Sequence, residues 1–330
     1  MKKRTLTQPQ KIVMGGAIVA VGLAGFLLYQ NRINIADWIS GMSYSPTPEM
    51  TAVENELSLT EDGKRILYAT HPTLEQRDDF NYLCDSHNQD ITILGCYTDN
   101  RIYLYDINEQ SLAGVKESTL AHELLHAVWE RMPESEKNRI SKILTEVYEN
   151  EQYKSLLAED LELYDESKRM DELHSRIGTE IVELPEELEA HYAKYFKNQD
   201  SLVAHYNNYI TPFREISAKL KEISGKIKEL EATIDEQSKS YYELAEKLSS
   251  DIKEFNQCAE KSGCFESISA FQKARNELVT RKAEIEEMFT KVNDLIKQYN
   301  TLRDEYNENY LRGKTLESII NSNAKVEDIK

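Results

Sequence analysis

The C-terminal third of the chain carries the pattern that most restricts its fold. No proline follows Pro212, and apolar residues then recur at alternating spacings of four and three. This heptad pattern is typical of long helices that pack as a coiled coil. One series runs from Ile216 to Leu248 and a second from Ala274 to Tyr306, separated by the sequence CAEKSGC, which offers a glycine for a turn. The pattern predicts an antiparallel coiled-coil hairpin over residues 212–313, followed by a C-terminal tail over 314–330.

The charge balance restricts the partners of the whole chain. Its 330 residues leave room for more than one domain, and its formal net charge is -18. Such an excess of acid argues against nucleic acid, or an anionic membrane surface, as the main partner because both would repel it. The heptad pattern instead offers a surface for self-association or for a protein partner.

An uncharged run of 18 residues, from Ile12 to Tyr29, is long enough to cross a bilayer as a helix. Lysine and arginine residues gather before it, so the positive-inside rule places residues 1–11 in the cytoplasm and the rest of the chain outside. A cleaved signal peptide is the alternative, but no clear A-x-A cleavage site follows the run. We therefore expect a single-pass cell-membrane protein with an anchor over 12–29. Residues 30–60, with two prolines and little periodicity, predict a stalk.

The four cysteines fit an oxidising compartment outside the cytoplasm. Cys84 and Cys96 lie in one region and Cys258 and Cys264 in another, so the simplest of the three possible pairings gives two local disulfides. Neither pair has the C-x-x-C spacing of a zinc ligand pair. Buried free thiols are the alternative to the disulfides.

Residues 61–211 predict an α+β domain built from a small antiparallel sheet and helices. Three short runs are rich in β-forming residues: 65–72, 91–97 and 101–107. The last two are joined by Thr98-Asp99-Asn100, which is typical of a hairpin turn. The strand 101–107 leads directly to the next helix, and it is either an edge strand that could pair with an extended peptide or an interior strand. Amphipathic helices are expected over 134–150, about 152–168, 170–184 and from 186 onward.

The helix that follows the sheet contains the sequence TLAHELLHAVWERM, from Thr119 to Met132. Histidines four residues apart, His122 and His126, stand on one face of a helix and can bind one metal ion. Glu123 follows the first of them, where its carboxylate can take a proton from a water that zinc activates. We expect Thr119 to cap the helix. The alternative is a buried amphipathic helix whose histidines only satisfy hydrogen bonds.

A catalytic zinc site needs a third protein ligand, and no H-x-x-G-x-x-H extension follows His126. Glu172, in the sequence DELHSR, is the candidate, and Glu180 is its rival. The second glutamate lies about 80° further round a helix than the first, so the two cannot easily share one ion. A donor to the developing oxyanion is also expected, and the candidates are Tyr164, His174, His191 and Tyr192.

The sequence HELLH at 122–126 resembles the motif of the zincin metallopeptidases. The distant acidic candidate makes the chain similar to the gluzincin branch, in which both histidines and a downstream glutamate bind zinc. Small membrane-anchored bacterial gluzincin-like proteins share this order of a sheet, a motif helix and a third-ligand helix. The resemblance covers roughly residues 60–210. The gluzincin pattern N-E-x-x-S-D is kept at its glutamate, Glu172, and at its serine, whereas Asp171 and Arg176 depart from it.

The motif and the resemblance predict a membrane-anchored, extracytoplasmic zinc endopeptidase that hydrolyses protein or peptide substrates. His122, His126 and Glu172 would bind Zn2+, and Glu123 would act as general base. One alternative is a coiled-coil scaffold or binding protein of the cell envelope with an inactive or structural zinc site. Another is a zinc hydrolase that acts on a non-peptide envelope polymer.

Overall fold

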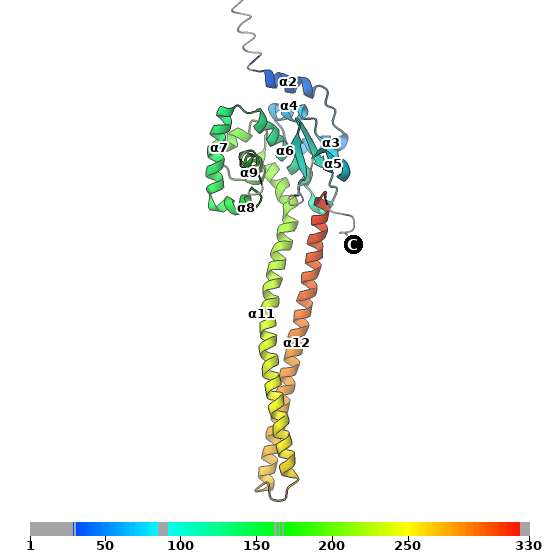
Figure 1. Ribbon diagram of the computed structural model, residues 1–330, viewed down its shortest axis with the longest axis vertical. Helices are drawn as coiled ribbons and strands as arrows, with labels where there is room; N and C mark the ends of the chain where they lie inside the picture. The colour runs from blue at the N-terminus through cyan, green and yellow to red at the C-terminus, as the bar shows by residue number, and fades with distance from the viewer. Residues whose placement is uncertain are drawn as a thin grey trace, which may run out of the picture. The chain divides into compact units, whose positions relative to one another are not determined.

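The computed structural model describes Tyr29 and residues 31–84, 92–161, 164, 166 and 168–323. Apart from Tyr29, the predicted membrane anchor over 12–29 lies outside these described residues. Within them, no helix combines the length and the apolar character needed to cross a membrane. The chain divides into two compact units, residues 1–212 with 317–330 and residues 213–316. Most of the described residues are helical, with one small sheet and long C-terminal helices (Figure 1).

The segment for which the sequence predicts a stalk, 30–60, instead forms two helices, α2 (Arg32–Gly41) and α3 (Pro48–Glu56). Pro48 occupies the first turn of α3, where its missing N–H leaves no helical bond unmade. The Thr47 side chain caps the same helix by accepting from the backbone N–H of Met50 at 3.2 Å. Met50 is buried in the core of the first unit. The prolines therefore mark a helix start, and the stalk prediction is wrong.

The run predicted as the first strand, 65–72, is largely the end of helix α4 (Glu61–Ala69). The Thr60 side chain caps this helix by accepting from the backbone N–H of Gly63 at 3.1 Å. Ile66 and Leu67 are buried on its inner face. A short apolar run fits a strand or a buried helix equally well, and here the cap and the packing favour the helix.

The sheet has three strands, β1 (Thr73–Glu75), β2 (Gly95–Thr98) and β3 (Arg101–Tyr105), in the order β1-β3-β2. β2 and β3 form the predicted hairpin, and its turn residues Asp99 and Asn100 have positive φ values of 49° and 58°. β1 lies parallel to β3, so the sheet is mixed and the prediction of a purely antiparallel sheet is wrong. β3 is the central strand, which excludes the edge position considered for 101–107, and β2 is an edge strand.

Helix α6 (Val115–Arg131) packs against the sheet and against α9 (Arg169–Glu180) (Figure 1). It begins earlier than predicted, after Gly114 at φ 93°, where a Cβ would lie 2.4 Å from the carbonyl oxygen of His205. Thr119, the predicted cap, lies inside the helix and donates its hydroxyl to the Val115 carbonyl. The other elements of this unit are α5 (Arg77–Leu83), the short 3-10 helix η1 (Gln110–Leu112), α7 (Glu134–Glu149), α8 (Glu151–Leu161) and α10 (Glu186–Tyr192).

The core of the first unit is one continuous cluster of buried side chains between Met50 and Leu202. Leu120, Leu124 and Leu125 of α6 are fully buried in it. Because α6 is held by the sheet on one side and by α9 on the other, its remaining face presents its side chains in fixed positions.

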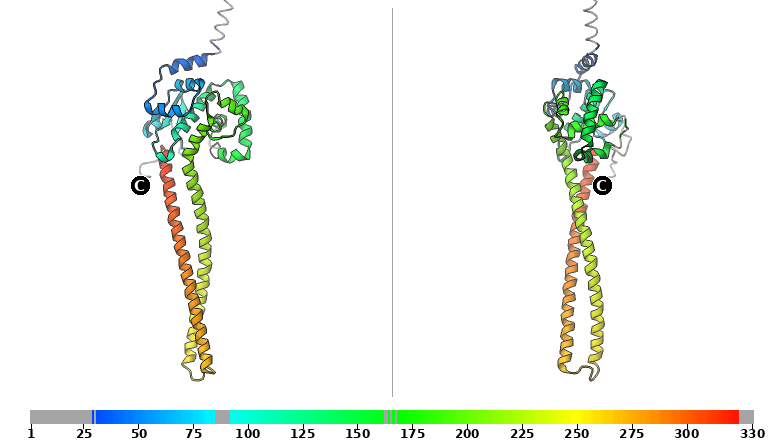
Figure 2. Two further views of the ribbon diagram at one scale, coloured as in Figure 1. Left: turned by 180° about the vertical axis from the view of Figure 1, so that it is seen from behind. Right: turned by 90° about the vertical axis from the view of Figure 1, so that its left-hand side faces the viewer.

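The second unit, residues 213–316, is the predicted antiparallel hairpin. It contains most of α11 (Gln199–Ala259) and most of α12 (Ile268–Ile320), two long helices that lie side by side (Figure 2). Pairs such as Lys219 with Glu305 at 2.9 Å and Arg281 with Asp251 at 2.6 Å fix their antiparallel register. The Cys258–Cys264 disulfide closes the tip. The Cys84–Cys96 disulfide links α5 to β2, so both predicted disulfides are confirmed.

Both long helices exceed the predicted bounds of 212–313. α11 begins at Gln199 and contains Pro212 in its interior, and α12 continues to Ile320 through part of the predicted tail, 314–330. A proline inside a helix removes one N–H and crowds the preceding turn, which can bend a long helix without ending it. The proline at 212 is therefore a poor guide to where the hairpin helix begins.

Candidate metal centre

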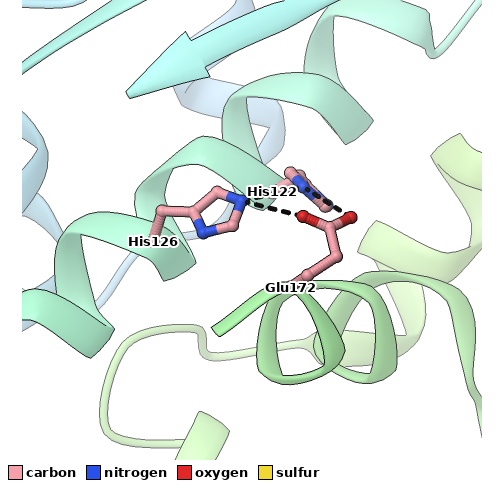
Figure 3. A group of neighbouring side chains, drawn as sticks. All are labelled: His122, His126 and Glu172. Atoms are coloured by element: carbon pink, nitrogen blue, oxygen red, sulfur yellow. Dashed lines mark hydrogen bonds and ion pairs between the residues drawn. The ribbon is translucent and has the colours of Figure 1, made fainter. Parts of the chain in front are cut away.

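Two histidines from α6 and one glutamate from α9 converge on a single point (Figure 3). The Nε2 atoms of His122 and His126 are 3.1 Å apart. The Glu172 carboxylate reaches both rings, with Oε1 3.7 Å from His122 Nε2 and Oε2 3.5 Å from His126 Nε2. Among the described residues, these three form the group whose donor atoms could hold one metal ion.

The donor set fits a zinc ion. Ligand atoms around a tetrahedral zinc with bonds of about 2.0–2.1 Å are about 3.3 Å apart, close to the observed separations of 3.1 to 3.7 Å. Glu172 is buried, whereas the side chains of His122 and His126 keep 22% and 17% of their surface exposed, so an ion could enter from one side. Three protein ligands leave a coordination position open, as in catalytic zinc sites.

The close packing of α9 on α6 brings Glu172 to the histidines. At Gly178 a Cβ would lie 2.5 Å from Leu125 Cδ1 and 2.6 Å from the Tyr192 ring, so only glycine permits this approach. Ser175, one turn closer to Glu172, is fully buried. Sequence reasoning missed Gly178, because its role depends on a neighbour far away in the chain.

Asp171 lies behind one of the two histidines, and sequence reasoning gave it no role at the site. The Nδ1–H of His126 donates to Asp171 Oδ1 at 2.8 Å. This bond fixes the ring and leaves Nε2 as the atom that faces His122 and Glu172, which is how metal-binding histidines are commonly oriented. The signal was present in the sequence, as an acid directly before Glu172.

The pKa values of the two glutamates of the site are shifted in opposite directions. Burial raises the pKa of Glu123, against the opposing effect of the two histidines. Burial would also raise the pKa of Glu172, but the charge and hydrogen bonds of His122 and His126 outweigh it, so that this pKa lies well below its usual range. Burial lowers the pKa of His126. The hydrogen bonds to Asp171 and Glu172 raise this pKa by more, so that its net shift is upward. Glu172 is thus held ionised, as a ligand must be, and Glu123 has the higher proton affinity that a base needs.

Glu180, the rival ligand, is engaged elsewhere. Its carboxylate accepts two hydrogen bonds from the Arg176 guanidinium, at 2.9 and 3.2 Å. Arg176 also donates to the Leu157 carbonyl, so the pair is fixed on the wall of the site. The eight-residue separation from Glu172 places Glu180 outside the group formed with the histidines.

Three of the four candidate oxyanion donors lie in the interior. His174 and His191 are buried with their Nε2 atoms 2.9 Å apart, and the Tyr192 hydroxyl donates to the His174 carbonyl at 2.8 Å. Tyr164 alone of the four lines the pocket that contains the metal-site residues. Tyr206 and Tyr209 of α11 line it as well, and sequence reasoning missed them because nothing local in the sequence marks them as part of the site.

The pocket has a volume of about 760 Å³ and is lined by both histidines of α6 and by Glu172 of α9. Its walls are β2 with the residues before it, the His122 face of α6, α9 and the start of α11. Gly95 of β2 lies so close to α6 that a Cβ at this position would be 2.9 Å from Glu123 Cγ.

Comparisons with family models, with curated proteins and with solved structures find no match to this chain. The function is therefore inferred from the geometry of the site.

Proposed function

We propose that this protein is a zinc-dependent endopeptidase, anchored in the membrane by residues 12–29 and working outside the cytoplasm. The observation that carries the proposal is the convergence of His122, His126 and the buried Glu172 on one point of an open pocket. The Asp171 carboxylate behind His126 adds the support that a metal ligand needs. The two disulfides fit an oxidising compartment.

The chain's own groups suit peptide hydrolysis. A zinc ion bound by the three ligands would supply a Lewis acid and lower the pKa of a water. Glu123, buried and adjacent to His122, would take the proton of the attacking water and return it to the leaving amine. Its raised pKa favours this exchange because the base must both accept and release a proton near neutral pH.

The edge strand beside the site favours a peptide over other polymers. β2 pairs with β3 along one side and is the last strand in the sheet order, so its other main-chain edge can accept an extended peptide. Gly95 and the residues before it line the pocket. A substrate paired with this edge would lie next to Glu123.

The test is the metal content of the purified full-length chain, as wild type, Glu172→Ala and Glu180→Ala. We expect about one zinc per chain in wild type and in Glu180→Ala, and loss in Glu172→Ala, since three ligands are needed. Glu123→Gln should still bind zinc but cleave a denatured protein about 100-fold to 10,000-fold more slowly. Loss of zinc only in Glu180→Ala would move the site, and wild-type cleavage by Glu123→Gln would refute the mechanism.

A scaffold role is the second candidate, and the separate compact unit of 213–316 is the observation that favours it. In that case the hairpin would bind a partner protein and the metal site would be structural or inactive. Zinc binding together with absence of cleavage in wild type would select this function.

A further inference from the structure

Helix α2 buries Asp37 against the protein and leaves large apolar side chains exposed. Asp37 is 5% exposed, whereas Trp38, Ile39 and Met42 are 63%, 61% and 69% exposed. Together with Ile35, which is 38% exposed, these apolar residues follow the spacing of one helix face, and we call them the outer stripe of α2. An uncovered stripe of this kind marks an interaction surface.

The inner face of α2 is fixed, so the helix cannot roll over to bury the stripe. The Asp37 carboxylate accepts from the Arg131 guanidinium, with both oxygens 3.0 Å from Nε. The Ser40 hydroxyl donates to the Ala69 carbonyl of α4 at 3.0 Å. Rolling would break the nearly buried ion pair, and loss of one partner from such a pair costs about 3–5 kcal/mol.

The outer stripe begins close to the end of the uncharged run of the sequence. The run ends at Tyr29 and α2 begins at Arg32, so the intervening chain spans at most about 11 Å. The polar layer of a bilayer is roughly 5–8 Å thick on each side. The guanidinium of Arg32 lies 4.4 Å from the Tyr29 ring centroid, a pair of residue types that is common at membrane interfaces.

We propose that the outer stripe of α2 lies in the interfacial layer of the same bilayer that anchors the chain. This inference rests on the anchor over 12–29, which belongs to the proposed function. Trp38 sits at headgroup depth, and Ile35, Ile39 and Met42 reach the acyl boundary, as in helices that lie in the membrane plane. Since Asp37 binds Arg131 at the end of α6, the membrane contact also orients the helix that carries the metal-site histidines.

The test uses the full-length chain in phosphatidylcholine vesicles, with and without lipids brominated on their acyl chains. The chain has two tryptophans, so Trp129→Phe leaves Trp38 as the only tryptophan, whose emission is measured with excitation that tyrosine does not absorb. Trp38→Phe, which leaves the half-buried Trp129 of α6, is the matched control. We expect brominated lipid to remove about half or more of the Trp38 emission, because interfacial tryptophans lie next to the upper acyl chain. Trp129 emission should stay unchanged.

Alkaline carbonate extraction of the same vesicles separates this inference from the anchor. If the chain is retained and Trp38 is quenched by aqueous acrylamide but not by brominated lipid, the stripe faces water and the inference is overturned while the anchor stands. If Trp38 is shielded from both quenchers, a second copy of the chain covers the stripe, which also overturns it. Release of the chain by carbonate would overturn the anchor and the inference together, and would leave zinc content as an independent test of the enzyme.

Discussion

At the scale of single residues, we expect the buried pair of His174 and His191 to make the folded protein sensitive to acid. Burial, followed by the nearby Lys194, lowers the pKa of His191 from 6.5 to about 4. Between these values the unfolded chain binds a proton that the folded chain does not, so stability falls as the pH falls from 6.5 to about 4. The full shift corresponds to about 3 kcal/mol.

His191→Gln should flatten this pH dependence, because glutamine does not titrate. The measurement is urea unfolding at about pH 7 and about pH 4.5, where wild type should lose about 2–3 kcal/mol more than the variant. His205→Gln, a partly exposed histidine of α11, is the control and should follow wild type. Equal losses in wild type and His191→Gln would show that the buried pair does not set the acid response.

The hydrogen bond from His126 to Asp171 gives a second prediction. Asp171→Asn removes the charge that fixes the ring and raises its basicity, so zinc should bind about 10-fold to 100-fold more weakly. Competition with a chelator measures this affinity directly. Asp106→Asn is the matched control, because its carboxylate pairs with Lys116 rather than with a metal-site histidine. An unchanged affinity in Asp171→Asn would leave the hydrogen bond without a role at the metal.

Residues that act through helix periodicity could be predicted from the sequence, and residues that act through tertiary contacts could not. His122, Glu123 and His126 follow from a spacing of four within one helix. Glu172 was predicted from its place in the sequence DELHSR on a later helix, and the structure places it beside the histidines. Gly178 and Tyr209 gave no local signal, because their roles arise only where α9 and α11 meet other elements.

At the scale of elements, the contact between β2 and α6 aligns the edge strand with the proposed base. A Cβ at Gly95 would lie 2.6 Å from Thr119 Cγ2 and 2.9 Å from Glu123 Cγ. Gly95→Ala should therefore push the strand from the helix and destabilise the fold by about 1–3 kcal/mol. Peptide cleavage should fall as well, since the substrate edge and Glu123 would no longer be aligned.

Gly225→Ala is the matched control for this substitution. A Cβ at Gly225, inside α11, meets nothing within 4 Å, so alanine should stabilise the helix by up to about 1 kcal/mol. The measurements are the free energy of unfolding by chemical denaturation and the rate of peptide cleavage, for both variants and wild type. Wild-type stability and activity in Gly95→Ala would mean that β2 and α6 can separate without cost.

Long periodic elements were predicted well, and short ones were not. The hairpin helices repeat one pattern over many turns, whereas the apolar runs of 61–107 are only a few residues long. Thr47 and Thr60 cap α3 and α4, although the prolines and weak periodicity of 30–60 suggested a stalk and the apolar run of 65–72 suggested a strand. The position of β1 beside β3 could not be predicted, because strand order depends on how the helices fill the space around the sheet.

At the scale of the whole molecule, the candidate metal site and the hairpin belong to separate units. Every side chain of the main buried cluster lies between Met50 and Leu202, and every wall of the pocket is formed by residues before Pro212. The residues after the hairpin return to the first unit, where Arg77 donates to the Ser318 carbonyl and Asn81 to the Ser322 carbonyl. The first unit thus holds both ends of the chain segment that forms the hairpin.

Replacing residues 213–316 by a flexible Gly-Ser linker should leave zinc content and the cleavage of short peptides close to wild type, because no residue of the first unit's core cluster or of the pocket is removed. Cleavage of folded protein substrates should fall if the hairpin selects them, since a separate binding unit acts through effective concentration rather than through chemistry. The measurements are zinc per chain and turnover of a short peptide and of a protein, with Glu123→Gln in the shortened chain as the inactive control. The shortened chain could still bind zinc and keep its helical circular dichroism but lose peptide cleavage. That outcome would show that the hairpin is needed for catalysis. Unchanged turnover of both substrates would instead assign the hairpin to the scaffold role, in which its partner is not a substrate.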